Sequence, residues 1–236
     1  MDGHLLRFNV PNAAARWRAE TLLTKEPVTI EWLRAIPEGA VMFDIGANVG
    51  VYTLFAGICR SARVFAFEPE AQNYALLNRN LALNGLDRRV TAYCIALADA
   101  QGMDRLYLSE WGAGGSCHSF GAEVGFDLAP RAAAFVQGSV SFSVDELVAS
   151  GKVPVPEYAK IDVNGFEHRV IRGMRNTLRD AKLRSIIVEL NPRIPEHCAA
   201  RDGLVSLGFR LDPAQVARST RRGGTFDGVA EHVFGR

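Results

Sequence analysis

The chain has 236 residues, 48% of them hydrophobic, which is enough for one sizeable core, so we expect a single domain over residues 1–236. Its 27 Lys and Arg and 26 Asp and Glu give a formal net charge of +1, which excludes a global field favouring nucleic acid or an acidic membrane surface. The four cysteines form no C-x-x-C pair, and neither a signal segment nor an apolar run of about 18 residues is found, so we expect a cytoplasmic protein with no membrane partner.

Residues 1–38 are expected to form a helical N-terminal extension or lid. Pro27 and Pro37 bracket a short helical pattern between them. The core is then expected at 39–236.

From residue 40 onward, short β-rich apolar runs alternate with helical patterns, which predicts βαβ units and a parallel sheet. The candidate strands are 40–45, 63–68, 90–97, 157–163 and 184–190. Near the end, 203–212 and 230–236 are interpreted as two last strands separated by a loop at 213–228. Together these runs predict an α/β fold.

Residues 110–139 interrupt this alternation, because they are rich in glycine and show no clean period. A structureless segment of this length inside a domain is usually functional. We expect it to close over a bound substrate.

The stretch "FDIGANVG" at 43–50 joins the first strand to the helical pattern at 51–59. Gly46 and Gly50 are expected where the backbone passes close to a ligand, with backbone N–H groups facing outward. The dinucleotide fingerprint G-x-G-x-x-G would need glycine at Asn48 and Val51, which argues against a pyrophosphate pocket. The carboxylate of Asp44 suits a cationic or hydroxyl-bearing ligand, which favours S-adenosylmethionine over NAD.

Glu68 ends the second strand, and Pro69 starts the next helix. An acid in this position of such folds accepts hydrogen bonds from the two ribose hydroxyls. The succession of strand, glycine turn, helix, strand and "EP" therefore predicts an adenosine ligand.

Five stretches, "VMFDIGANVGVYTLFA", "VFAFEPEAQNYALLNRNLALNGL", "VDELV", "AKIDVNGFEHRVIRGM" and "IIVELNP", resemble the consecutive motifs of FkbM-type S-adenosylmethionine-dependent methyltransferases. The resemblance covers about residues 26–192. It implies the class I methyltransferase fold, a Rossmann-like doubly wound sheet of seven strands, mostly parallel with an antiparallel last strand. It also implies O-methylation of a hydroxyl group. The family usually has an acid where this chain has Asn164.

The residues expected to contact the cofactor are Asp44, Gly46, Asn48, Gly50, Tyr52, Thr53, Glu68, Pro69, Asp99 and Asp162. Asp99 follows the third strand, where this architecture usually brings a polar side chain to the adenine amino group; a turn-forming role is the alternative. Tyr52 and Thr53 are placed at the carboxylate end of the cofactor, although Tyr52 could simply pack.

Three residues are candidates for catalysis. Asp162 ends the fourth strand beside the cofactor and could act as the base, bind the methionine amine or cap the following helix. His118 is a candidate general base because imidazole titrates near neutrality, with His168 and His197 placed behind it. Glu167 lies in the first turn of a helix, where an acid is also expected for structural reasons.

Glu189 and Asn191 follow the fifth strand and could join Asp162 in binding a divalent metal ion, since oxygen ligands suit magnesium. No dense ligand cluster is visible, so we disfavour a metal.

The predicted function is O-methylation of a small natural product or a sugar. One alternative is nucleic-acid methylation, with the basic loop 217–224 as a phosphate patch; this is disfavoured because that loop is short and rich in glycine. Another is a catalytically silent S-adenosylmethionine-binding module, to which only Asn164 points.

Overall fold

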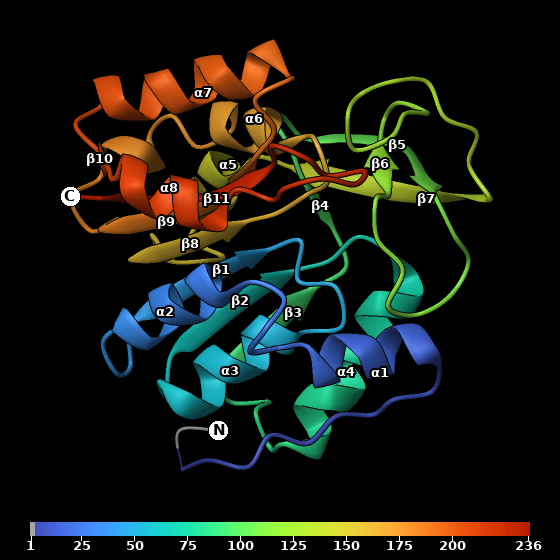
Figure 1. Ribbon diagram of the computed structural model, residues 1–236. Helices are drawn as coiled ribbons and strands as arrows, with labels where there is room; N and C mark the ends of the chain where they lie inside the picture. Colours follow the sequence, from blue (N-terminus) through green and yellow to red (C-terminus); the bar gives the residue numbers. More distant parts are fainter. Residues whose placement is uncertain (1–2) are drawn as a thin grey trace.

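The computed structural model describes residues 3–236 as two β-sheets with helices packed around them (Figure 1). Residues 1 and 2 of the expected N-terminal extension lie outside the described part. The larger sheet has seven strands in the order β10-β11-β9-β8-β1-β2-β3. Their bounds are β1 Val41–Ile45, β2 Arg63–Phe67, β3 Val90–Tyr93, β8 Tyr158–Ile161, β9 Ser185–Leu190, β10 Arg210–Leu211 and β11 Ala230–Gly235.

Strands β1, β2, β3, β8 and β9 are parallel, whereas β11 runs antiparallel to both β9 and β10. This is the mixed α/β sheet with an antiparallel last strand that the sequence predicts. The central strands are buried on both faces, which explains their nearly continuous apolar sequence.

Helices cover both faces of this sheet (Figure 1). On one face lie α2 Pro27–Ala35, α3 Val51–Cys59 and α4 Ala71–Leu83; on the other lie α5 Val144–Ala149, α6 Glu167–Arg172, η1 Thr177–Arg179 and α7 Pro195–Ser206. A hydrophobic core lies on each face of the sheet, and successive side chains of β1 point into opposite cores. Met42 packs under α3, and Phe43 packs on the opposite face. None of the helices in residues 3–236 is long and apolar enough to cross a bilayer.

A second sheet of four strands was not expected. Its order is β4-β7-β5-β6, with β4 Ala96–Leu97, β5 Gly102–Leu108, β6 Ser119–Phe120 and β7 Phe135–Phe142. The predicted strand 90–97 is thus two strands in different sheets, and 110–139 is not wholly irregular. The pattern was hidden because β5 and β7 leave most of their side chains at least partly exposed and so lack a clear apolar alternation.

The C-terminal end of the chain also differs from expectation, whereas the N-terminal region contains the expected short helix as α2. The predicted strand 203–212 comprises the end of helix α7, a short turn and the two-residue β10, and the loop 213–228 contains helix α8 Pro213–Ser219. The Asp212 side chain accepts the Ala214 N–H, so Asp212 and Pro213 are an N-terminal signal that the sequence analysis overlooked. Helix α1 Ala13–Glu20 begins similarly, with Asn12 accepting the Ala15 N–H at 2.8 Å.

The carboxyl ends of β1, β2, β8 and β9 lie along one edge of the sheet, and the strand order reverses there between β1 and β8. Gly46, directly after β1, has a φ of 80°. A Cβ at this position would lie 1.8 Å from the Asp162 carbonyl oxygen. Only glycine therefore permits the close approach of the β1 turn to the end of β8.

We predict that Gly46→Ala lowers the free energy of unfolding by about 3–5 kcal/mol, because backbone must move as well as adopt a strained φ. Gly39→Ala is the matched control, since Gly39 has a φ of 76° and no atom within 4 Å of its would-be Cβ. Gly39→Ala is expected to lower the free energy of unfolding by only about 1–2 kcal/mol, because the left-handed backbone conformation is then the only source of strain. Urea denaturation measures both, and equal losses would show that the contact with Asp162 is unimportant.

Candidate active site

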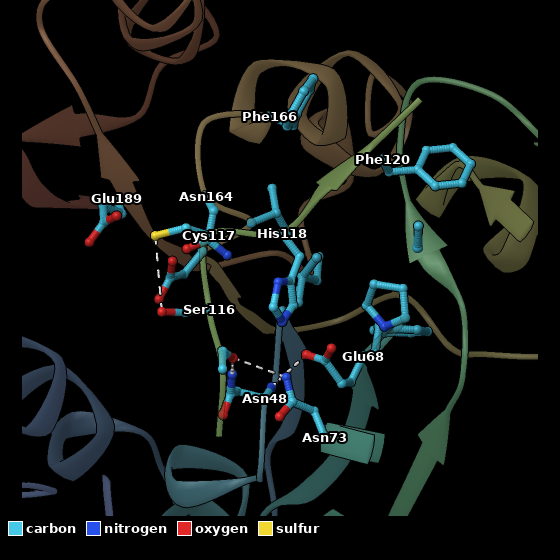
Figure 2. Close-up of a pocket in the computed structure, with 18 of the residues that line it drawn as sticks. Asn48, Glu68, Asn73, Ser116, Cys117, His118, Phe120, Asn164, Phe166 and Glu189 are labelled. Atoms are coloured by element: carbon cyan, nitrogen blue, oxygen red, sulfur yellow. Dashed lines mark hydrogen bonds between the residues drawn. The ribbon is translucent and has the colours of Figure 1, made fainter. Parts of the chain in front are cut away.

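A cavity of about 430 Å³ opens at this edge of the sheet. Phe67, Ile95 and Leu97 give one end an apolar lining, and Asp162, Asn164 and Glu189 line a polar end. Figure 2 shows Glu68 and Asn48 on one side and Glu189 and Asn164 on the other, with His118 between them. The floor comes from Gly46, Asn48, Glu68 and Pro69, four of the residues predicted to contact the cofactor.

The backbone N–H groups of the 46–50 turn do not face outward, which corrects the sequence-based expectation. Those of Gly46 and Ala47 donate to the Phe67 carbonyl at 2.9 and 3.1 Å, and that of Asn48 donates to the Glu68 carboxylate at 2.7 Å. The N–H groups of 49 and 50 are likewise bonded inside the turn. The turn is a floor without free donors, so it is not an anion nest.

Glu68 is held in the cavity floor by its own neighbours. One carboxylate oxygen accepts the Asn48 N–H, and the other accepts the Glu70 N–H at 2.9 Å. The Asn73 side chain is a further donor to this carboxylate, whose two oxygens have about four lone pairs in all and so keep capacity for a ligand hydroxyl. Burial outweighs these hydrogen bonds and raises the pKa of Glu68 to about 7.

Asp44 and Thr53 do not line the cavity, although both were predicted to contact a cofactor. The Thr53 hydroxyl donates to the Asp44 carboxylate at 2.6 Å, and Lys160 Nζ lies 3.6 Å from the other oxygen of that carboxylate. Asp44 is 1% exposed. These side chains bind one another behind the turn and support it.

Gly50 and Tyr52 also lie outside the cavity lining. Gly50 is the N-cap of α3 and faces Leu77, and the Tyr52 hydroxyl donates to Glu26 at 2.8 Å. The packing alternative for Tyr52 is therefore the one observed.

Asp99 lies away from the cavity. Arg169 and Arg172 hold its carboxylate at 2.9 and 3.3 Å. The chain leaves the larger sheet after β3 and enters the second sheet at β4, so Ile95 and Leu97 line the apolar end while Asp99, beyond β4, lies at the surface.

Asp162 lies at the polar end, with 23% of its side chain exposed to the cavity, and Lys160 Nζ 3.5 Å away. Burial acts to raise its pKa, but Lys160 and Lys25 outweigh this and hold that pKa below its ordinary value. The neighbouring Glu189 shows the opposite behaviour, since burial and the charge of Asp162 raise its pKa well above the ordinary value. Asp162 is thus the ionised member of the pair at neutral pH.

The guanidinium of Arg221 contacts three carboxylates, Glu189 at 2.5 Å, Glu231 at 2.8 Å and Glu26 at 3.5 Å. Oxygens of Glu26, Asp162 and Glu189 lie within 4.8 Å of one another. The candidate metal ligands therefore include Glu26 in place of Asn191, whose side-chain oxygen accepts the Arg193 N–H. Arg221, Lys160 and Lys25 already compensate much of this negative charge.

His118 lines the cavity but is not arranged as a general base. The Ser109 N–H donates to its Nδ1 at 3.2 Å, so the neutral ring carries its proton on Nε2. Burial and the charge of Arg18 lower the pKa of His118 to about 4. At neutral pH the ring has no nitrogen free to accept a proton, which corrects the prediction for this residue.

Glu167 is buried beside the cavity and holds the loop that carries Asn164. Its carboxylate accepts the N–H groups of Val163 at 2.7 Å and Gly165 at 3.0 Å. His197 receives the Asn191 N–H on Nδ1, so its Nε2–H donates to the Gly165 carbonyl at 2.9 Å and lies 3.3 Å from Glu167. His168 packs beside His197, also outside the cavity lining.

The sequence analysis missed the residues that fix the roof of the cavity. Asn73 on α4 accepts the Gly114 N–H at 2.7 Å and donates to the Gly115 carbonyl at 3.1 Å. Asn48 donates to the same carbonyl at 2.6 Å. The only signal was an asparagine in the first turn of the helical pattern at 71–83. Phe226, from the C-terminal loop, was missed as well.

Comparison with known proteins places the chain among methyltransferases. The Methyltransferase FkbM domain matches residues 44–211. The hexuronic acid methyltransferase AglP of Haloferax volcanii is 32% identical over 200 residues, which span 81% of this chain and 72% of that protein.

Two solved structures share the fold. A methyltransferase FkbM from Methylobacillus flagellatus has 15% identity and a TM-score of 0.54. The matched region covers 85% of the present chain but only 44% of the longer Methylobacillus protein. An rRNA methylase from Streptococcus thermophilus has 12% identity and a TM-score of 0.50 over 90% of this chain and 98% of that one. At these identities the similarity concerns the fold alone.

We predict that Glu167 makes stability depend on pH. Burial raises its pKa to about 8, so the folded protein keeps a proton that the unfolded chain loses above the ordinary value of 4.5. Stability from this group is therefore full below about pH 4.5 and is lost as pH rises through about 8. Glu167→Gln should flatten the dependence of unfolding free energy on pH across this window while keeping an acceptor for the loop.

Glu167→Ala is the contrasting variant, because it leaves the Val163 and Gly165 N–H groups without their acceptor. We expect it to lose about 2–4 kcal/mol of stability. If the wild type and Glu167→Gln gave parallel stability profiles from pH 4 to 9, the assigned proton would be wrong.

Proposed function

The chain belongs to the FkbM methyltransferase family, and from that premise we propose that it transfers a methyl group from S-adenosylmethionine to a hydroxyl oxygen of a sugar. Hexuronic acids are the first acceptor class to test, because AglP, a relative at 32% identity, is a hexuronic acid methyltransferase.

The residues of the cavity fit this donor. An adenine ring requires an apolar slot, which Phe67, Ile95 and Leu97 supply. The ribose requires acceptors for two hydroxyls, and Glu68 presents two anchored carboxylate oxygens beside that slot. The cationic methionine end would be held at the polar end of the cavity, where Asp162 is ionised. The position of Glu68 is the observation that carries the proposal.

The bound donor supplies an electrophilic methyl group attached to a sulfonium. The protein has to place the acceptor oxygen in line with that methyl group and receive the hydroxyl proton. Asp162 can do both, since it is ionised, reaches the cavity and is held by Lys160. Glu189 is less available because Arg221 binds its carboxylate.

Aromatic side chains surround the acceptor end. Phe166 and Phe226 line it, and Phe226 packs on Phe126 with ring centroids 4.4 Å apart. Aromatic faces suit the apolar C–H face of a sugar ring, while Asn164 and Glu189 offer hydrogen bonds to its hydroxyls.

The nucleic-acid alternative loses its proposed phosphate patch. Arg221 is engaged with three carboxylates, and Arg218 pairs with Glu31 at 3.2 Å. Two arginines of the basic segment 217–224 therefore form ion pairs within the protein and are not available to bind phosphate groups.

We predict methyl transfer from labelled donor to uronic-acid glycosides, with Asp162→Asn lowering kcat by about 10²–10⁴-fold because the proton acceptor is lost. Asp202→Asn, on the outer helix α7, is the matched control and should retain wild-type kcat. Scintillation counting of the product measures both rates. Donor binding without transfer to any sugar in a panel of acids and neutral glycosides would contradict the proposal.

Donor affinity is expected to rise with pH through about 7, where Glu68 loses its proton and becomes a better acceptor for the ribose hydroxyls. Calorimetry with S-adenosylhomocysteine should show roughly ten-fold tighter binding at pH 8 than at pH 6. Glu68→Gln should bind about 1–3 kcal/mol more weakly and lose that pH dependence. A wild-type affinity that is constant with pH would remove Glu68 from the donor site.

A further inference from the structure

Arg18 on helix α1 lines the same cavity from the N-terminal side. Its Nε donates to the Gly114 carbonyl at 2.6 Å. This bond uses one of the five N–H donors of the guanidinium and fixes the plane of the group. The side chain is partly buried, so the remaining donors lie in a restricted space.

Arg18 differs from the other cations that line the cavity. Lys25 pairs with Glu26 at 2.5 Å, and Arg221 contacts three carboxylates. Within residues 3–236, Arg18 has no ion pair, and its two terminal nitrogens make no hydrogen bond. A guanidinium with a free pair of parallel donors is suited to a carboxylate.

The position of Arg18 is built by several independent contacts. Asn12, which caps α1, also donates to the Ala113 carbonyl at 2.8 Å. Gly114 packs directly on α1, since a Cβ there would lie 2.9 Å from the Ala15 nitrogen. Asn73 holds Gly114 from the other side. The guanidinium is thus presented by a helix and a backbone segment that are fastened to each other.

The charge of Arg18 acts on groups inside the cavity. Burial acts to raise the pKa of Asp162, and the charge of Arg18 opposes it together with the larger effects of Lys160, Lys25 and Arg221. Arg18 also adds to burial in lowering the pKa of His118. Arg18 therefore faces the region between the floor and the polar end. An anionic part of a ligand in that region would meet a cation without having to displace a protein carboxylate.

We propose that Arg18 forms a carboxylate-binding subsite of this cavity. The inference rests on the proposed function, which provides two carboxylates that could occupy it: that of the methionine part of the donor and that of a uronic-acid acceptor.

The donor arm of the test uses calorimetry on wild type, Arg18→Gln and Arg18→Lys, with two probes. S-adenosylhomocysteine carries the carboxylate, and 5′-methylthioadenosine lacks it. If the donor fills the subsite, Arg18→Gln should weaken S-adenosylhomocysteine binding about ten- to hundred-fold and leave methylthioadenosine binding unchanged. Arg18→Lys should recover part of the loss because it keeps the charge.

The acceptor arm measures KM for D-glucuronic acid and for D-glucose, each as its methyl glycoside, and the direct binding of each by NMR titration. If the acceptor fills the subsite, Arg18→Gln should raise KM and weaken binding for the acid by a similar factor while the neutral sugar is unaffected. Arg16→Gln, an exposed arginine on the same helix, is the matched control, and circular dichroism checks that each variant is folded.

Unchanged binding of both carboxylates in folded Arg18→Gln overturns the subsite. Wild-type protein that binds no S-adenosylhomocysteine overturns the proposed function, and the subsite is then decided by the glucuronic acid titration alone. Equal weakening of S-adenosylhomocysteine and methylthioadenosine, with no change for the acid sugar, would show a structural effect and also overturn it.

Discussion

The whole site depends on one close approach, in which the turn after β1 lies against the backbone that ends β8. Gly46 permits it, because any larger residue would place an atom on the Asp162 carbonyl. This approach sets Asp162 beside the cavity floor, and the floor in turn positions Glu68 through the Asn48 N–H. A carboxylate from β2 and one from β8 are thereby brought to a single cavity by backbone geometry and not by contact between their side chains.

Burial and charge then give similar side chains different properties. Glu68 and Glu167 are both buried, and that burial raises the pKa of each. Asp162 is also surrounded by protein, but Lys160 keeps it ionised. Two carboxylic acids thus differ in charge because of their surroundings: Glu167, behind the wall of the cavity, retains its proton, whereas Asp162, at the cavity surface, is ionised.

Most of the predicted site residues that line the cavity are those whose placement follows from strand ends. Glu68, Asp162, Gly46 and Asn48 belong to segments where a strand stops and the chain must turn, and the order of strands brings such points together. The misplaced residues depended on side-chain direction or on partners distant in sequence. Asp44 lies within a strand and faces Thr53, and Asp99 is drawn outward by arginines about 70 positions later. Arg18 and Phe226 reach the site only through tertiary packing, which no local pattern records.

The contacts of Arg221 have a consequence for the order in which the tertiary contacts form. This one cation, from the C-terminal loop, contacts Glu26 of the N-terminal region together with Glu189 and Glu231. Without Arg221, Glu26 would keep only Lys25 as an ion-pair partner within residues 3–236 and Glu189 would have none there, and a buried carboxyl group that loses its partner opposes close packing. The polar end of the cavity is therefore complete only when the segment that carries Arg221 has packed against both the N-terminal region and β9.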